Sequence, residues 1–251
     1  MRWKSKVRKL AERLTGTHIY RVLPRGIDFA SDIAYALPMY RANVVFDVGA
    51  NIGQSAKIFL EKFPTSHIFC FEPVTDTYHL LQHAMQNNKR VNCFQLAFAS
   101  SKQTRQMILQ GSPTMFFMLG QSSELPNKDA QMESVNVDTL DDFCRMNSFD
   151  HISYLKIDTE GGDLDVLKGA AMMLTEQKID IVQVEAGMNP NNTRHVSFLS
   201  IRKFLESYRY FLFGIYEQVP EWPTGEPHLR RINPIFVSQQ VIQNNRIFAK
   251  S

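Results

Sequence analysis

The fold is decided by the stretch Val44-Val45-Phe46-Asp47-Val48-Gly49-Ala50-Asn51-Ile52-Gly53-Gln54-Ser55. Its apolar, mostly β-branched beginning predicts a buried strand over residues 43–47, and the two glycines that follow predict a tight turn. A helical pattern then covers residues 52–63. A buried strand that passes through a glycine turn into a helix is typical of the first unit of a parallel sheet flanked by helices.

The same alternation of strand and helix continues along the rest of the chain. We expect further strands at residues 67–72, 91–97, 151–157, 179–185, 209–216 and 234–239. Helices are expected at residues 27–40, 75–87, 138–147, 163–175 and 195–207. The last two strands flank a loop, Pro220 to Arg231, that shows no helical pattern, so the final strand is expected to run antiparallel. The fold class is therefore α/β, with a doubly wound, mostly parallel seven-stranded sheet.

Two segments fall outside this alternation. Residues 1–40 are expected to form an N-terminal helical extension, and residues 41–251 the α/β domain. Within that domain, residues 100–136 look like an insertion over one end of the sheet, with two short strands at 104–110 and 132–137. Its piece rich in methionine and phenylalanine, residues 111–118, fits either ordinary core or a lid over a ligand pocket.

The N-terminal extension is basic and amphipathic. Residues 1–25 hold eight lysines and arginines against one acidic residue, whereas the rest of the chain carries 20 basic and 24 acidic side chains. The net charge of +3 therefore belongs to the N-terminus, and no nucleic-acid partner is expected for the body. One helical stripe contains Trp3, Val7, Leu10 and Leu14. This stripe suits either packing on the protein's own core or peripheral contact of residues 1–20 with an anionic membrane surface or a partner.

Composition indicates the cellular setting. With 251 residues, 44% of them hydrophobic, the chain can bury a full core. No apolar run approaches the ~18 residues of a membrane-spanning helix, and no secretory apolar core follows the basic N-terminus. The three cysteines, Cys70, Cys93 and Cys144, lack metal-type spacing and indicate reduced thiols. We expect a cytoplasmic protein, with a peripheral place at the membrane surface as the alternative.

The turn after the first strand also indicates which cofactor to expect. A dinucleotide site uses G-x-G-x-x-G, whose middle glycine lets the backbone approach a pyrophosphate. Here position 51 is Asn and the glycine spacing is G-x-x-x-G, which disfavours NAD(P). Asp47 at the end of the first strand can meet a cationic amine, and Glu72 at the end of the second stands where a ribose diol would lie. Together these two acids describe S-adenosylmethionine better than NAD.

Four motifs, in order along the chain, resemble those of FkbM-type methyltransferases. They are Asp47–Gly53, Phe71–Pro73, Leu155–Gly161 and Val166–Ala170. The resemblance spans about residues 43–217 and implies the Rossmann-like class I fold of methyltransferases that use S-adenosylmethionine and act mostly on hydroxyl groups of sugars, glycolipids and polyketides. One departure is that the family usually continues after Gly161 with a small residue and Glu, whereas this chain has Gly162-Asp163. The role of that acid, in helix capping or in binding, therefore stays open.

The resemblance also assigns roles at the cofactor site. It implies that Asp47, Gly49 and Gly53 shape the methionine pocket, that Glu72 holds the ribose, and that the end of the third strand borders the adenine. The expected cofactor-binding set is Asp47, Gly49, Ala50, Asn51, Gly53, Glu72, Pro73, Ala97 and Phe98. As structural alternatives, Asp47 fits a cap of the following helix and Glu72 fits a surface acid beside a turn.

Three carboxylates follow the fourth and fifth strands. Asp158, Glu160 and Glu185 are expected to converge at the edge of the sheet where ligands of such folds bind. An alcohol must lose its proton as it attacks, and a positioned base contributes about 10²- to 10⁴-fold. We expect Asp158 to be that base, with the other two as helpers or as anchors for sugar hydroxyls. Their structural alternative is helix capping or pairing with Lys156 and Arg194.

Three further interpretations of this region remain open. His195, just beyond the fifth strand, has a side chain suited to a base but also fits a surface position at a helix start. His228 lies in a loop with Trp222, Arg230 and Arg231, a composition that fits either sugar contact or a solvated loop. No metal ligand is assigned, and a Mg²⁺ ion bridging the three carboxylates is an alternative.

The sequence therefore predicts an S-adenosylmethionine-dependent O-methyltransferase that acts on a hydroxyl of a sugar, glycan or glycolipid. The alternatives are an NAD(P)-dependent oxidoreductase and a non-catalytic module that binds the cofactor or a partner. The sequence does not indicate which hydroxyl is methylated or the oligomeric state.

Overall fold

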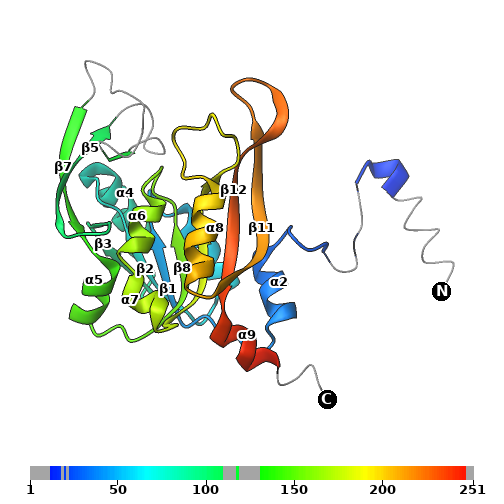
Figure 1. Ribbon diagram of the computed structural model, residues 1–251, viewed down its shortest axis with the longest axis horizontal. Coiled ribbons are helices and arrows are strands. Elements are labelled where there is room, and N and C mark those ends of the chain that lie inside the picture. Colours follow the sequence, from blue (N-terminus) through cyan, green and yellow to red (C-terminus); the bar gives the residue numbers. More distant parts are fainter. Residues whose placement is uncertain (1–11, 18–19, 21–22, 110–116, 119–130, 247–251) are drawn as a thin grey trace.

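The computed structural model describes residues 12–17, 20, 23–109, 117–118 and 131–246 (Figure 1). Its strands are β1 (Val44–Val48), β2 (His67–Phe71), β3 (Val91–Phe94), β4 (Ala97–Phe98), β5 (Gln103–Leu109), β6 (Phe117–Met118), β7 (Gln131–Asp138), β8 (Ile152–Ile157), β9 (Ile179–Val184), β10 (Ala186–Gly187), β11 (Tyr210–Glu221) and β12 (Glu226–Ser238). Its helices are α2 (Phe29–Ala36), α3 (Gln54–Lys62), α4 (Thr75–Met85), α5 (Leu140–Met146), α6 (Asp163–Lys168), α7 (Ala171–Thr175), α8 (Phe198–Ser207) and α9 (Gln239–Arg246).

The main sheet has the order β10-β12-β9-β8-β1-β2-β3, with β11 paired to β12. Strands β3, β2, β1, β8 and β9 run parallel to one another, whereas β12 is antiparallel to both β9 and β11. After β1 the chain adds β2 and β3 on one side, and it later adds β8 and β9 on the other side. The strand order therefore reverses between β1 and β8. The doubly wound sheet and its antiparallel final strand are confirmed. The short strand β10 makes the sheet eight-stranded instead of seven-stranded.

Helices cover both faces of this sheet because successive strand residues point to opposite sides. Phe46 and Val48 belong to one hydrophobic cluster, which also takes side chains from α5, α6, α7 and α8. Val45 belongs to the other, which takes side chains from α2, α3, α4 and α9. The protein is therefore a three-layer α/β structure, and its ligand-binding edge is expected at the carboxyl ends of β1 and β8.

The insertion builds a second, smaller sheet. Its order is β4-β7-β5-β6, and the predicted strands of the insertion are confirmed as β5 and β7. The prediction that the third strand runs to residue 97 is wrong, because β3 ends at Phe94 and Ala97–Phe98 pairs with β7 instead. Most of the piece rich in methionine and phenylalanine lies outside the described residues. Met118, from that piece, is buried in a small cluster with Met107 and Val135.

Two element boundaries differ from the prediction. The helix expected over residues 163–175 is divided into α6 and α7 at Gly169, where an added Cβ would lie 2.1 Å from the carbonyl oxygen of Ala99. The loop expected between Pro220 and Arg231 is instead the outer part of the β11–β12 hairpin, whose pairing continues to Glu221 and Glu226 through several register shifts. Figure 1 shows this hairpin extending beyond the sheet.

The N-terminal extension is described only in part. Residues 12–15 are helical and Leu14 is exposed, whereas Trp3, Val7 and Leu10 lie outside the described residues. The helix expected over residues 27–40 is shorter, since α2 begins after its cap Asp28, which accepts a hydrogen bond from the Ala30 N–H (3.2 Å). Across the part of the chain that the structure describes, no helix combines the length and apolar character that crossing a membrane requires.

Candidate active site

A cavity of about 300 Å³ opens at the carboxyl edge of the main sheet, at the point where the strand order reverses. This volume lies at the lower end of the range typical of small-molecule sites. The expected site residues that line it are Gly49, Ala50, Asn51, Glu72, Pro73, Ala97, Phe98, Asp158, Glu160 and Glu185. Of the expected set, Asp47 and Gly53 do not line it. The sequence thus brings together cofactor-type and catalytic-type residues in one cavity.

In the turn after β1, the backbone N–H groups of residues 49–53 are all hydrogen-bonded within the protein. The N–H groups of Gly49 and Ala50 both donate to the carbonyl oxygen of Phe71 (3.0 Å each), and that of Gly53 donates to Ala50 (2.9 Å). The N–H of Asn51 donates to Glu72 Oε2 (3.1 Å), and that of Ile52 donates to Asn51 Oδ1 (2.8 Å). A phosphate-binding turn must offer such N–H groups to its ligand. Residues 49–53 therefore offer no free N–H group to a ligand, which leaves the first turn of α3, where Gln54 and Ser55 line the cavity, as the source of such donors in this unit.

Gly49 is required by the close approach of two loops. It has φ of +78°, and an added Cβ would lie 1.9 Å from the carbonyl oxygen of Asp158. Because this contact is with backbone, no side-chain movement can relieve it. The glycine therefore allows the turn after β1 to lie directly against the loop after β8, and so places the two halves of the cavity side by side.

Glu72 lies at the end of β2 with its carboxylate facing the cavity. Its Oε1 accepts the Val74 N–H (3.0 Å) and its Oε2 the Asn51 N–H (3.1 Å). Each carboxylate oxygen still has capacity for another donor. Burial raises the pKa of Glu72 to about 7 despite these two hydrogen bonds. The interpretation of Glu72 as a surface acid is wrong, because its side chain is buried.

Asp47 is completely buried and does not reach the cavity. Its carboxylate lies 3.4 Å from Lys156 Nζ and accepts no hydrogen bond from any described residue. Lys156 Nζ also lies 3.2 Å from Asp158 Oδ2. Burial alone would lower the pKa of Lys156, but the charges of Asp158 and Asp47 outweigh it and raise this pKa, so the lysine stays charged. Lys156 thus joins the expected amine-binding acid to the expected base.

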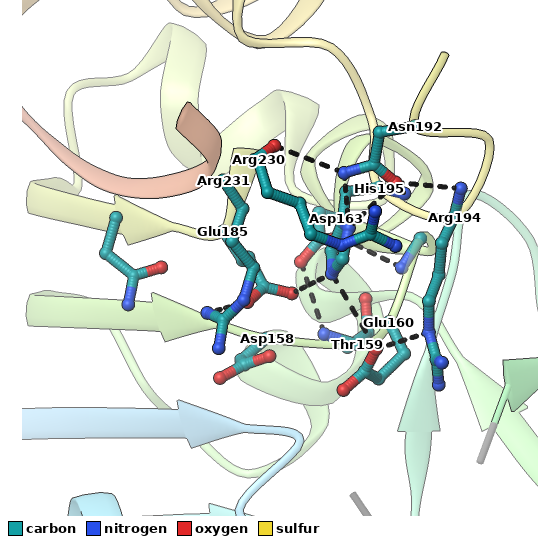
Figure 2. A network of polar contacts seen from close by, with 12 residues as sticks. Asp158, Thr159, Glu160, Asp163, Glu185, Asn192, Arg194, His195, Arg230 and Arg231 are labelled. Atoms are coloured by element: carbon teal, nitrogen blue, oxygen red, sulfur yellow. Dashed lines mark hydrogen bonds and ion pairs between the residues drawn. The ribbon is translucent and has the colours of Figure 1, made fainter. Parts of the chain in front are cut away.

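The three expected catalytic carboxylates converge, each with a cation beside it. Asp158 pairs with Lys156, and Arg194 Nε contacts Glu160 Oε2 at 2.8 Å. Arg231 donates to Glu185 Oε1. Burial and the neighbouring Glu185 raise the pKa of Glu160 to about 7. Both the predicted convergence and the predicted ion pairs are therefore present. Figure 2 shows the three carboxylates and the contact of Glu160 with Arg194.

His195 lies behind these carboxylates and not on the surface. Only 6% of its side chain is exposed, and its Nε2 lies 2.9 Å from Glu185 Oε2 and 3.8 Å from Glu160 Oε2. The amide of Asn192 contacts the other ring nitrogen, Nδ1. Burial by itself would lower the pKa of His195, but the neighbouring glutamates outweigh it and raise this pKa. Since His195 does not line the cavity, it is poorly placed to take a proton from an acceptor directly.

Asp163, the residue at the family departure, has a structural role. It is fully buried, and its two carboxylate oxygens accept the N–H groups of Thr159 and Gly161 (3.2 Å each). Burial together with the charges of Glu185 and Asp158 raises its pKa to about 7. Asp163 therefore fixes the turn that carries Glu160, whose φ is +52°. The shorter side chain still caps the turn at the start of α6.

The outer hairpin contains the other predicted histidine. His228 is exposed and pairs with Glu226 at 3.0 Å. Nearby, the buried Glu221 pairs with Arg230 at 3.0 Å and accepts a hydrogen bond from the Asn189 side chain at 2.7 Å. These contacts attach the hairpin to the loop after β10, while His228 itself stays outside the cavity.

Three charged residues that line the cavity are outside the expected site set: Lys156, Glu217 and Arg231. The sequence indicates Lys156 only as an ion-pair partner, although a lysine in an otherwise apolar buried strand is itself a signal. Arg231 belongs to the composition that fits either sugar contact or a solvated loop, and it reaches the cavity because β12 includes this segment. Glu217 left no signal in the sequence, since it reaches the cavity through an irregularity of β11, where its φ is +47°.

Comparison with known proteins identifies one family. The model of the methyltransferase FkbM domain matches residues 47–212. The chain is 27% identical over 154 residues to the hexuronic acid methyltransferase AglP of Haloferax volcanii, covering 60% of this chain and 59% of AglP. It is 24% identical over 146 residues to the 2-O-methyltransferase NoeI of Sinorhizobium fredii, covering 54% and 60% respectively. The chain thus spans about three-fifths of the length of these curated relatives.

Solved structures show a more distant likeness. A precorrin-6y C5,15-methyltransferase from Geobacter metallireducens superposes with a TM-score of 0.45 at 9% sequence identity. The superposition covers 88% of this chain and 92% of that one.

Proposed function

Because the chain belongs to the family of methyltransferases with an FkbM domain, we propose that it transfers the methyl group of S-adenosylmethionine to a hydroxyl oxygen of a sugar. The cofactor supplies an activated methyl group on a sulfonium, which leaves as a neutral thioether. The protein's contribution is to hold the two substrates in line and to accept the acceptor's proton.

The residues of the cavity fit this cofactor. Glu72 is anchored by two backbone N–H groups, so its remaining lone pairs face the cavity in a fixed orientation and suit a vicinal diol. Ala97 and Phe98 supply an apolar wall for the adenine, to which Met107 and Met118 of the insertion add. Gly49, Ala50 and Asn51 line the cavity with their N–H groups already bonded within the protein, which suits a cofactor without a pyrophosphate. Asp47 does not line the cavity, so its role is indirect: its carboxylate lies 3.4 Å from Lys156 Nζ and helps to position that lysine.

Asp158 is placed to accept the proton. It follows β8, lines the cavity and is the most exposed of the three carboxylates, with 30% of its side chain accessible. Lys156 fixes its orientation through the contact at 3.2 Å. As the acceptor oxygen attacks, the O–C bond forms, the S–C bond breaks and the proton passes to Asp158. Glu160 and Glu185 are already held by arginines, so their role is to bind neighbouring hydroxyls of the acceptor.

The sugar acceptor is supported by the relatives and by the lining of the cavity. One relative is described as a hexuronic acid methyltransferase and another as a 2-O-methyltransferase. The acceptor side of the cavity presents the carboxylates of Glu160, Glu185 and Glu217 together with the guanidinium of Arg231. Such a set of donors and acceptors suits a polyhydroxylated ligand.

One observation carries the proposal: the carboxylate of Glu72 and those of Asp158, Glu160 and Glu185 face the same cavity, beside a turn whose N–H groups are all occupied. The occupied N–H groups of residues 49–53 and the Asn at position 51, where a dinucleotide turn has glycine, make the oxidoreductase the weaker alternative. The intact carboxylate set disfavours a module that only binds the cofactor.

The test combines binding with transfer. Calorimetry should detect binding of S-adenosylhomocysteine and none of NAD⁺ by the purified chain. Methyl-labelled S-adenosylmethionine should then transfer label to members of a panel of uronic acids, neutral hexoses and glycolipids. Binding without transfer to any hydroxyl acceptor would favour the non-catalytic module, and binding of NAD⁺ alone would refute the proposal.

A further inference from the structure

Glu160, Glu185 and His195 bring three potential metal ligands together at the inner end of the cavity. One ligand atom from each residue lies within 4.8 Å of the other two. The two glutamates line the cavity, while His195 reaches them from behind, out of the loop between β10 and α8. Figure 2 shows both carboxylates directed toward the imidazole. We infer that these three side chains form a binding site for a divalent transition-metal ion of the Mn²⁺ type.

A buried oxygen in this group has no hydrogen-bond donor. Only 3% of Glu185 is exposed, and its Oε2 accepts no hydrogen bond from any described residue. Nevertheless His195 Nε2 lies only 2.9 Å away. Two ligand atoms separated by ~3 Å correspond to one edge of an octahedron with bonds of ~2.1 Å. His195 Nε2 and Glu185 Oε2 are close but are not aligned for a hydrogen bond. Their separation is the one expected of neighbouring ligands of a single ion.

The other ring nitrogen of His195 contacts both polar atoms of the Asn192 side chain. Asn192 Oδ1 lies 3.1 Å from Nδ1, and Asn192 Nδ2 lies 2.9 Å from it. Asn192 Oδ1 also accepts the backbone N–H groups of Arg194 and His195, and Nδ2 donates to the carbonyl oxygen of Arg230 (3.2 Å). These contacts accommodate either tautomer: Nδ1 accepts from Nδ2 when it is unprotonated, and donates to Oδ1 when it carries the proton. Metal binding selects the second arrangement, which leaves the Nε2 lone pair for the ion.

The charges around the site also favour a cation. The carboxylates of this network are Asp47, Asp158, Glu160, Asp163 and Glu185, and the cations paired with them are Lys156, Arg194 and Arg231. Carboxylates thus outnumber cations. Arg231 contacts the outer oxygen of Glu185, Oε1, so that Oε2 remains available on the side of His195.

The mixed ligand set identifies the class of ion. Mg²⁺ prefers oxygen ligands and retains several waters, whereas an imidazole together with two carboxylates suits first-row ions such as Mn²⁺. Asp158 is not part of the group and pairs with Lys156 instead. The site therefore differs, in both ligands and ion, from a Mg²⁺ site formed by the three catalytic carboxylates. An ion here would lie beside the acceptor hydroxyls of the proposed function, but its binding does not depend on that function.

The test measures the metal alone. The full chain is stripped with a chelator and titrated with Mn²⁺ while the free ion is followed by electron paramagnetic resonance. We expect one bound ion per chain, resistant to an equal concentration of Mg²⁺, and a nitrogen coupling from the imidazole in pulsed spectra. His195→Gln should abolish this coupling and weaken binding about 10- to 100-fold, as should Glu185→Gln.

The exposed pair His228 and Glu226, with its own 3.0 Å contact, provides the matched control. His228→Gln should leave Mn²⁺ binding unchanged, and the thermal melting curve of each variant checks that it folds. Absence of binding above a non-specific level, or a nitrogen coupling that survives in His195→Gln, would overturn the site. Binding of S-adenosylhomocysteine, measured in the absence of metal, tests the proposed function separately.

Discussion

The backbone N–H of Asn51 donates a hydrogen bond to Glu72 Oε2 at 3.1 Å, which joins the glycine turn after β1 to the carboxylate after β2. The link is reinforced by Gly49 and Ala50, whose N–H groups both donate to Phe71. The acid proposed to bind the ribose is therefore held by the same turn that is proposed to shape the methionine side of the cavity. Two parts of the proposed cofactor site that are about 20 residues apart in the sequence are thus directly bonded to each other.

This relationship predicts that cofactor binding is coupled to a proton. The pKa of Glu72 is raised from 4.5 to about 7 by burial, so in the free protein this group stabilises the fold below its unfolded pKa, and that contribution is lost as the pH rises through about 7. Ribose hydroxyls that donate to the carboxylate would favour its charged form. Affinity for S-adenosylhomocysteine should therefore fall as the pH is lowered below about 7, and binding should release a proton.

Calorimetry in buffers of different ionisation enthalpy measures this release. Because Glu160 and Asp163 also have pKa values near 7, the variant Glu72→Gln isolates the contribution of Glu72. It should lose that part of the proton release and bind the cofactor about 1.5–3 kcal/mol more weakly. Unchanged proton release in Glu72→Gln would contradict the assignment.

Replacing the proposed base should slow turnover without weakening cofactor binding. Asp158→Asn preserves the size of the side chain but removes its charge and its capacity to accept a proton. We expect the rate of methyl transfer to fall about 10²- to 10⁴-fold. The matched control is Asp142→Asn, which makes the same change in an exposed pair with Arg145 on α5 and should leave the rate unchanged. An Asp158→Asn variant with the wild-type rate would show that the base lies elsewhere.

The close approach of Gly49 to Asp158 predicts a specific loss of stability. Both Gly49 and Gly225 have positive φ, at +78° and +71°, but an added Cβ at Gly225 meets nothing within 4 Å. Gly225→Ala therefore measures the backbone cost alone, and Gly49→Ala adds a clash with backbone. We expect Gly49→Ala to lower the free energy of unfolding by about 1–3 kcal/mol more than Gly225→Ala in urea titrations. If both variants lose the same free energy of unfolding, the turn after β1 and the loop after β8 can move apart without a free-energy cost.

The basic N-terminal segment predicts an interaction independent of catalysis. Deleting residues 1–20 should leave the affinity for S-adenosylhomocysteine unchanged, because none of the described residues of this segment lines the cavity. It should reduce co-sedimentation with anionic vesicles, and in the intact chain that association should weaken as salt is added. If the intact chain does not sediment with these vesicles, the membrane hypothesis is wrong.

The parts of the protein that follow from local patterns could be predicted from the sequence. The parallel strands and the positions of Glu72, Asp158, Glu160 and Glu185 follow from apolar runs that end in an acid at the carboxyl edge of the sheet. The face of the main sheet on which a given residue lies is harder to predict from the sequence. Asp47 shares the face of Val45, packed under α3 and α4, and this placement separates it from the cavity that Val48 reaches.

Long-range contacts account for the other differences. His195 is buried because its loop folds back against Glu185, a contact that the sequence does not encode locally. The break between α6 and α7 depends on Ala99, which lies about 70 residues earlier in the chain. The length of the β11–β12 hairpin depends on the buried pair of Glu221 and Arg230, which has no signature in the pattern of apolar residues.

The second sheet has a consequence for how such a protein can diversify. Its strand β5 and the short β6 place Met107 and Met118 in the cavity wall, while the hairpin on the other side contributes Glu217 and Arg231. The insertion forms a sheet of its own and the hairpin extends beyond the main sheet, whereas Asn51 and Glu72 directly follow its strands β1 and β2. Mutation in the hairpin can therefore remodel the wall proposed to meet the acceptor, while the turn that joins Asn51 to Glu72 keeps its geometry, so that new substrate preferences can arise without a new catalytic scaffold.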